Sequence, residues 1–237
     1  MIDILELSKK VLTRLATLDF EKDGSNSTEQ LIFPVKIQSD GSKEIKRISE
    51  QELRVLFIEE FKIKYPGLYY SIETPTTGKF SFGKTYEDIK VENEGQLASH
   101  DMCVFKKNSI NYERIMNIEF KHRNSGIKKT GKDILKLIRE EQNGAFIHLL
   151  ENTNSNTLVS IFEKLTTCFT DYQKQWVNEH KTIQLVILSL KQKKLIHCEL
   201  RKNDLLEIAN FLSLQQKFGN IDSFNNSNWS FIDLDKN

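Results

Sequence analysis

Hydrophobic residues recur at three- and four-residue intervals in several stretches of the chain, which is the spacing of one face of an α-helix. The pattern predicts helices over residues 3–18, 49–65, 131–142, 156–180 and 204–216. The second of these begins at Ser49, because Ser49-Glu50-Gln51-Glu52 has the form of a capping box.

Runs rich in aromatic and β-branched residues predict the strands. They are expected over residues 31–38, 68–75, 100–107, 113–122, 145–150, 183–190 and 195–200. Residues 76–98 give no clear prediction. The last 20 residues are polar, with Trp229 and Phe231 as candidate docking points. From residue 49 to 150 the order is helix, three strands, helix, strand, and no linker divides the chain, so one α/β domain is predicted.

The charge of the chain is balanced overall but is concentrated in one segment. The 237 residues include 34 Lys and Arg against 33 Asp and Glu, a formal net charge of +1 that excludes overall basicity. From Lys121 to Arg139, however, seven basic residues accompany one acid, Asp133. Such a surplus is typical of a surface that binds a phosphate backbone, although it also fits a solvated helix face. The nucleic-acid-binding residues expected here are Arg123, Lys128, Lys129 and Lys132.

Cysteine usage and hydropathy point to a cytoplasmic protein. The three cysteines lie far apart without a CxxC pair, so neither a disulfide framework nor a cysteine zinc site is indicated. The chain is charged from Asp3 onward, and no apolar run approaches the roughly 20 residues that span a bilayer. We therefore expect neither secretion nor a membrane partner.

One pair of predicted strands carries acids in a distinctive position. Asp101 begins the first strand, and Glu119-Phe120-Lys121 ends the second. Strand alternation places Glu119 and Lys121 on one face and Phe120 on the other. If the strands form a hairpin, Asp101 lies beside Glu119, and two such carboxylates require a proton or a divalent cation. Mg²⁺ fits this need, although a solvated ion pair at a strand end is the simpler alternative.

These segments resemble the core of the PD-(D/E)XK nuclease superfamily, the restriction-endonuclease-like fold. The resemblance rests on the runs SEQELRVLF, YYSIETPT, SHDMCVF, NIEFK, GKDILKLIREE and AFIHLL. It implies an αβββαβ core over residues 49–150, with a mixed central sheet flanked by helices. Residues 1–48 would then be an N-terminal helix and strand extension, and residues 151–237 a C-terminal α/β extension of the same domain.

The resemblance also implies roles for individual residues. Asp101 and Glu119 would bind Mg²⁺, with Mn²⁺ able to substitute, and Phe120 would offer its backbone carbonyl. Lys121 would be the catalytic lysine. A glutamate from the first core helix joins the site in many members, for which Glu52 is the first candidate and Glu60 the second. One departure is that His100 rather than proline precedes Asp101.

The implied activity is metal-dependent hydrolysis of phosphodiester bonds, in DNA more than in RNA. A homodimer is an open expectation, because two-fold symmetric enzymes occur in this family. Two alternatives accompany this expectation. One is a catalytically inactive nucleic-acid-binding module of the same fold. The other is a P-loop nucleotide hydrolase, because residues Gly78 to Thr85 satisfy the pattern GxxxxGK[ST].

Overall fold

One mixed sheet of eight strands runs through the molecule, in the order β10-β9-β8-β7-β6-β5-β3-β4. The computed structural model describes residues 2–24, 27–37, 44–153, 155–204 and 229–236. The strands are β3 (Tyr69–Ser81), β4 (Lys90–Val91), β5 (Gln96–Lys107), β6 (Tyr112–His122), β7 (Asn143–Leu150), β8 (Ile183–Ser189), β9 (Lys194–Leu200) and β10 (Trp229–Asp233). The short strands β1 (Val35–Ile37) and β2 (Glu44–Lys46) pair separately.

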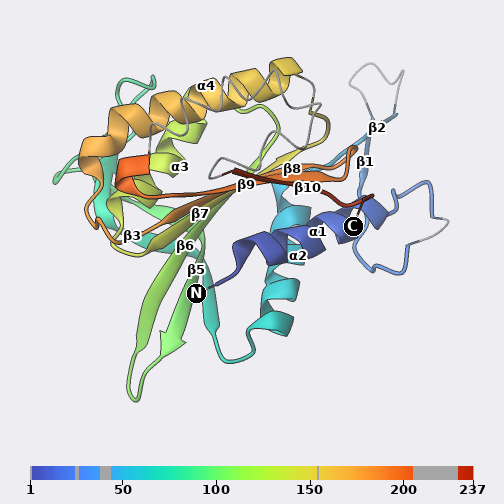
Figure 1. The fold of residues 1–237 in the computed structure, drawn as a ribbon, viewed down its shortest axis with the longest axis horizontal. Helices are drawn as coiled ribbons and strands as arrows, with labels where there is room; N and C mark the ends of the chain where they lie inside the picture. The colour runs from blue at the N-terminus through green and yellow to red at the C-terminus, as the bar shows by residue number, and fades with distance from the viewer. Residues whose placement is uncertain (1, 25–26, 38–43, 154, 205–228, 237) are drawn as a thin grey trace.

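Helices cover both faces of this sheet (Figure 1). They are α1 (Ile4–Thr17), α2 (Glu50–Lys64), α3 (Ile127–Arg139) and α4 (Ser155–Tyr172). Among the described strands, parallel pairing occurs at β6–β7 and β7–β8, and α3 and α4 are the crossover helices that such parallel connections require. They share one face, while α1 and α2 pack on the other. Among the described residues, no helix is both long and apolar enough to cross a bilayer.

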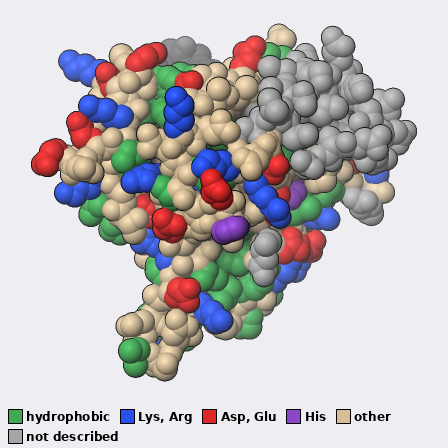
Figure 2. Space-filling model, turned by 60° about the vertical axis from the view of Figure 1, so that its left-hand side comes forward, with side chains coloured by type: hydrophobic (Ala, Val, Ile, Leu, Met, Phe, Trp, Pro, Cys, Tyr) green, Lys and Arg blue, Asp and Glu red, His purple; other side chains and the backbone are tan. Residues whose placement is uncertain are grey.

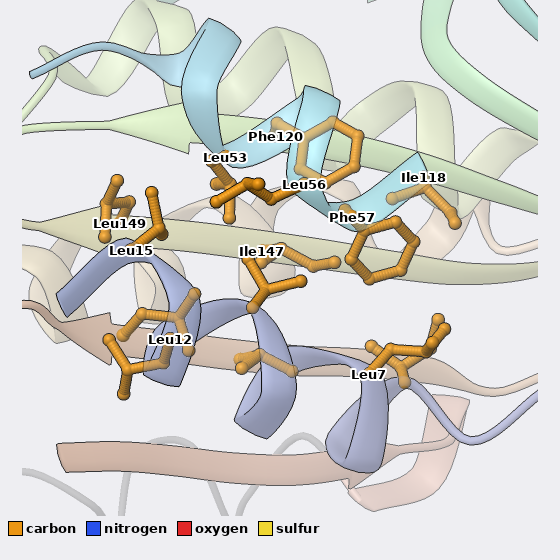
Figure 3. Close-up of a cluster of buried hydrophobic side chains, with 14 of the residues drawn as sticks. Leu7, Leu12, Leu15, Leu53, Leu56, Phe57, Ile118, Phe120, Ile147 and Leu149 are labelled. Carbon is orange, nitrogen blue, oxygen red and sulfur yellow. The ribbon is translucent and has the colours of Figure 1, made fainter. Parts of the chain in front are cut away.

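Each face of the sheet has its own hydrophobic core. Figure 3 shows the core beneath α1 and α2, to which both helices and strands β6 and β7 contribute. The labelled side chains are Leu7, Leu12, Leu15, Leu53, Leu56, Phe57, Ile118, Phe120, Ile147 and Leu149. The rings of Phe57 and Phe120 meet edge to face at 5.3 Å. Phe120 thus packs on the α2 face, which leaves the opposite face of β6 to Glu119 and Lys121.

The predicted α/β class and the mixed, helix-flanked sheet are confirmed. The element order from α2 to β7, leaving aside the two-residue β4, is helix, three strands, helix, strand, as expected. Strands β8, β9 and β10 extend the same sheet, so residues 183–200 and 229–233 add to it rather than form a separate layer.

Several element boundaries differ from the prediction. Helix α3 begins at Ile127, four residues early, because the polar first turn carries little hydrophobic signal. Helix α4 ends at Tyr172. Strands β3 and β5 extend into residues 76–98. Buried Thr76 continues there the alternation of buried Thr74, which their polar residue type conceals in the sequence. The C-terminal segment with Trp229 is a strand rather than a docked tail. Residues 205–216, predicted as most of the last helix, lie outside the described residues.

Candidate functional site

Strands β5 and β6 pair as the predicted hairpin, but they separate at one end. Their ladder begins at Met102 opposite Ile118, so the residues before Met102 and after Ile118 form the two arms of a fork. At its mouth, the backbone N–H of Phe120 donates to Oδ2 of Asp101 at 2.7 Å. The side chain of Asp101 thus replaces a backbone acceptor, which holds its carboxylate beside the arm that carries Glu119.

At the fork, the side chains of β5 stop alternating regularly between the two faces of the sheet. Ala98 packs against the core under α3 and α4, whereas Met102 belongs to the core under α1 and α2. Residues four apart in a regular strand share a face, so β5 changes face between them. Glu73, which lies opposite Asp101 in the β3–β5 register, has a left-handed φ of 50°. This irregularity allows Asp101 to point along the sheet toward β6.

Glu119 is fully buried in the fork and has two polar partners. Its Oε1 lies 2.5 Å from Nδ1 of His100 and 2.8 Å from Nζ of Lys136, which α3 supplies. Burial raises the pKa of Glu119 well above its ordinary value, and the ammonium of Lys136 opposes this. Burial also lowers the pKa of His100 well below its ordinary value, so the imidazole beside Glu119 is neutral.

Lys121 and Lys136 share the carboxylate of Asp133 on α3. Lys121 Nζ lies 2.5 Å from Asp133 Oδ2, and Lys136 Nζ lies 3.2 Å from Oδ1. Burial lowers the pKa of Lys121, but the ion pair with Asp133 outweighs it and the pKa is raised. Asp133 therefore orients a permanently charged lysine. One feature of the sequence could have revealed this role. Asp133 is the single acid of the basic segment, and it lies at a buried position of α3.

Glu50 of α2 interacts electrostatically with this cluster. Burial raises its pKa, with Lys121 opposing and Asp101 and Asp133 adding to the shift, so it lies among their charges. Glu52 instead accepts the backbone N–H of Ser49 at 2.8 Å, and the capping box predicted there is confirmed.

Glu60, the second candidate, is directed away from the fork. It forms an ion pair with Arg14 of α1 at 3.1 Å. Glu50 was not among the candidates from the sequence, because the capping pattern drew attention to Glu52. Glu50, whose pKa responds to Lys121, Asp101 and Asp133, is a further candidate for the helix glutamate.

A guanidinium stands at the open side of the fork. Arg54 lies 3.9 Å from Asp101 Oδ1 and 2.7 Å from Glu73, whose side chain is 62% exposed. Asp101 itself is 19% exposed, in contrast to the 1% of Glu119. A ligand would therefore reach the cluster past Arg54 and Asp101.

The donors at the fork suit a hard cation, but no metal cage is preformed. Within the part of the chain that the structure describes, no three His, Cys, Asp or Glu groups are placed to hold a metal ion. Mg²⁺ is commonly held by only one or two protein carboxylates together with waters and substrate phosphate. Asp101 and Glu119 meet that requirement, and burial raises the pKa of both. Such carboxylates would gain from a divalent cation, which must displace Lys136 from Glu119.

Much of the local basic surplus is compensated internally. Lys121 and Lys136 face carboxylates, and Lys128 donates to the carbonyl of Gly83 at 2.5 Å. The ammonium of Lys132 lies 4.7 Å from the ring centre of Phe82. Arg123 and Lys129 are exposed. Over the face drawn in Figure 2, acidic and basic side chains are interspersed.

The P-loop hypothesis is contradicted by the backbone. Gly78 lies inside β3, and a two-residue strand, β4, rather than a helix follows the motif. The amides of Lys84 and Thr85 both donate to Oδ2 of Asp88 at 2.7 Å. A P-loop needs a strand, a loop with free amides and then a helix. Residues 78–91, all of which are described, therefore lack its geometry.

Comparisons with known proteins give no assignment. No protein-family model, curated protein or solved structure matches this chain. The α/β architecture thus stands on the structure alone. Membership of the PD-(D/E)XK superfamily stays a proposal, and its support comes from the side chains at the fork.

Proposed function

We propose that the protein is a metal-dependent nuclease that hydrolyses phosphodiester bonds, in DNA more than in RNA, on a restriction-endonuclease-like core. The observation that carries this proposal is the strand fork, where Asp101 is held beside the arm bearing Glu119 and Lys121. Two acids converge at the mouth of the fork, and their burial disfavours charge. A site that binds a cation accounts for both features.

In this mechanism the protein positions the reactants. Asp101, Glu119 and the backbone carbonyl of Phe120 would hold Mg²⁺, which supplies an activated water and neutralises charge on the phosphate when bound. Lys121, oriented by Asp133, places its ammonium toward the attacking oxygen or the phosphate. Arg54 at the open side offers a second positive charge to the incoming backbone.

A binding module without turnover is the second candidate, and one contact favours it. Lys136 already provides Glu119 with a cation at 2.8 Å, so the buried carboxylate is compensated without metal. In that case the fold would bind nucleic acid through its exposed cations, and substitutions within the fork would leave binding unchanged.

Replacement of Lys121 by methionine separates the two candidates. We expect Mg²⁺-dependent cleavage of plasmid and oligonucleotide substrates to fall by about a hundred-fold or more, because a charge aimed at the transition state is lost. Methionine keeps most of the side-chain volume. The matched control is Lys174→Met at an exposed position outside the fork and the basic segment, which should retain cleavage. Cleavage that survives Lys121→Met, or a parent protein that binds but never cleaves with Mg²⁺ or Mn²⁺, contradicts the nuclease proposal.

Metal binding should also depend on pH in a defined direction. The pKa values of Glu50, Asp101 and Glu119 are raised, mainly by burial. The folded state thus holds protons more tightly than the unfolded state, and metal-free stability falls as pH rises from the ordinary carboxyl pKa of about 4 through the raised values. Mg²⁺ competes with those protons. We therefore expect Mg²⁺ to raise Tm more at pH 8 than at pH 5 in paired scans with EDTA.

The paired scans with Mg²⁺ and EDTA also provide the control for this prediction. Taking the difference between Mg²⁺ and EDTA at each pH cancels pH effects from other groups. The Glu119→Gln variant should show a smaller Mg²⁺ gain at pH 8. An equal gain at both pH values, or a larger one at pH 5, would argue against carboxylate ligation.

A further inference from the structure

The outer end of the hairpin carries an open aromatic hollow that the fork does not explain. It has a volume of about 330 Å³ and is lined by Tyr69, Tyr70, Ser71, Phe105 and Tyr112. Tyr69, Tyr70 and Tyr112 are each more than a third exposed. In Figure 1 this end of β5 and β6 extends away from α3 and α4. We call this feature the aromatic hollow.

Positively charged side chains lie beside the rings of the aromatic hollow. Tyr69 and Tyr112 meet at 4.9 Å between ring centres, and Phe105 is the register partner of Tyr69. The ammonium of Lys107 lies 5.9 Å from the Tyr112 ring centre. The guanidinium carbon of Arg114 lies 5.9 Å from the ring centre of Phe105, but this guanidinium is bonded to Glu140 and to the carbonyl of Pro75. Exposed rings beside an ammonium are the chemistry that binds single-stranded nucleic acid, because bases stack on the rings and phosphates meet the cation.

Pairing with a second copy through the edge of β3 fits the structure less well. The outer side of β3 has a described strand partner only at Phe80 and Ser81, so Tyr69 to Ile72 form an open edge. That edge is short, because Glu73 has a φ of 50° and Pro75 lacks an N–H. Such interruptions are the usual protection of edge strands against pairing.

The aromatic hollow lies within reach of the fork along β3. Glu73, which is bonded to Arg54 at the open side of the fork, is four residues from Tyr69. At about 3.3 Å per residue these positions are about 13 Å apart. This is the rise of about four stacked nucleotides at about 3.4 Å each. A strand that enters at Arg54 can therefore reach the rings with a base three or four nucleotides away.

We propose that the aromatic hollow stacks an unpaired base of the nucleic-acid strand whose phosphate lies at Asp101 and Glu119. The inference rests on the proposed function and names its substrate class as single-stranded or locally unpaired nucleic acid. Bases within an intact duplex cannot present their faces to Tyr69 and Tyr112, so the hollow selects strands whose bases are free.

The test compares Tyr112→Leu with Tyr112→Phe. Leucine removes the aromatic face and keeps an apolar side chain, whereas phenylalanine keeps the ring. Binding of a fluorescent 12-nucleotide single strand is measured in EDTA by anisotropy. We expect Tyr112→Leu to weaken binding by about ten-fold and Tyr112→Phe to stay within about two-fold of the parent. A blunt duplex should bind all three proteins alike. Ile110→Ala, at an exposed position in the turn of the same hairpin, is the control and should bind as the parent does.

The outcomes separate this inference from the proposed function. If Tyr112→Leu weakens binding but the parent never cleaves, the aromatic hollow stands and the nuclease fails. If Lys121→Met abolishes cleavage while Tyr112→Leu binds single strands as the parent does, the nuclease stands and the hollow is overturned. Equal losses with leucine and phenylalanine overturn stacking. A parent dimer that Tyr112→Leu dissociates, with oligonucleotide binding unchanged, also overturns it by assigning the hollow to a second copy.

Discussion

Glutamine in place of Glu119 is expected to lower Mg²⁺-dependent cleavage by about a thousand-fold while nucleic-acid binding in EDTA stays within a few-fold of the parent. The substitution removes an anionic oxygen from the proposed metal site and keeps the shape of a side chain that is 1% exposed. The remaining carbonyl can still accept from His100, and Lys136 keeps its contact with Asp133 at 3.2 Å. The fold should therefore survive. Cleavage is measured under single-turnover conditions at saturating Mg²⁺.

Two further Glu→Gln substitutions on α2 serve as comparisons. Glu52→Gln should cleave as the parent does, because glutamine also completes a capping box. Glu50→Gln should lose activity to an intermediate degree, since Glu50 lies among the charges of the fork. A Glu119→Gln protein with parental activity, or a Glu52→Gln protein as inactive as Glu119→Gln, would remove the assignment.

Methionine in place of Lys181 is expected to reduce the free energy of unfolding by about 3 kcal/mol. Lys181 is 2% exposed, and its ammonium donates to the carbonyls of Leu137 and Ile138 at 2.8 and 2.5 Å, and also to that of Glu140. These are carbonyls at the C-terminal end of α3, which have no partner within the helix. Leaving them buried and unpaired costs about 1–3 kcal/mol per group before relaxation. Urea denaturation at pH 7 measures the change.

The same lysine predicts how stability varies with pH. Burial lowers the pKa of Lys181 from 10.5 to about 7. Between these values the unfolded chain holds a proton that the folded protein lacks, so the contribution of Lys181 to stability rises with pH from about 7 to 10.5 and is absent below about 7. The variant should lack that rise. Lys191→Met is the control, because its ion pair with Glu151 is exposed and worth less than about 1 kcal/mol. A Lys181→Met protein as stable as this control would contradict the prediction.

The parts of the fold predicted correctly are those encoded within a few residues. The capping box at Ser49 needs only a hydroxyl and an acid three positions apart, and the opposite faces of Glu119 and Phe120 follow from strand alternation. Neither depends on which segment packs nearby. For the same reason the order of elements from α2 to β7 could be derived before their arrangement was known.

The partners of the site residues could not be predicted in the same way. Asp133 and Lys136 reach the fork only because α3 crosses over the face of the sheet that bears Glu119. That placement depends on tertiary packing, and in the sequence both residues look like ordinary members of a charged segment. The basic segment illustrates the same limit, because its sequence did not reveal that Lys121 and Lys136 pair with carboxylates inside the protein.

The change of face at Asp101 places a limit on engineering this protein. A designer who idealised β5 and β3 would restore regular alternation and relieve the left-handed backbone at Glu73, which costs of order 1–3 kcal/mol. The result would be a more stable sheet in which Asp101 no longer turns toward Phe120. Stabilising substitutions at Glu73 and Asp101 should therefore be selected against wherever the fork has a function. Libraries screened for thermostability alone should enrich inactive variants.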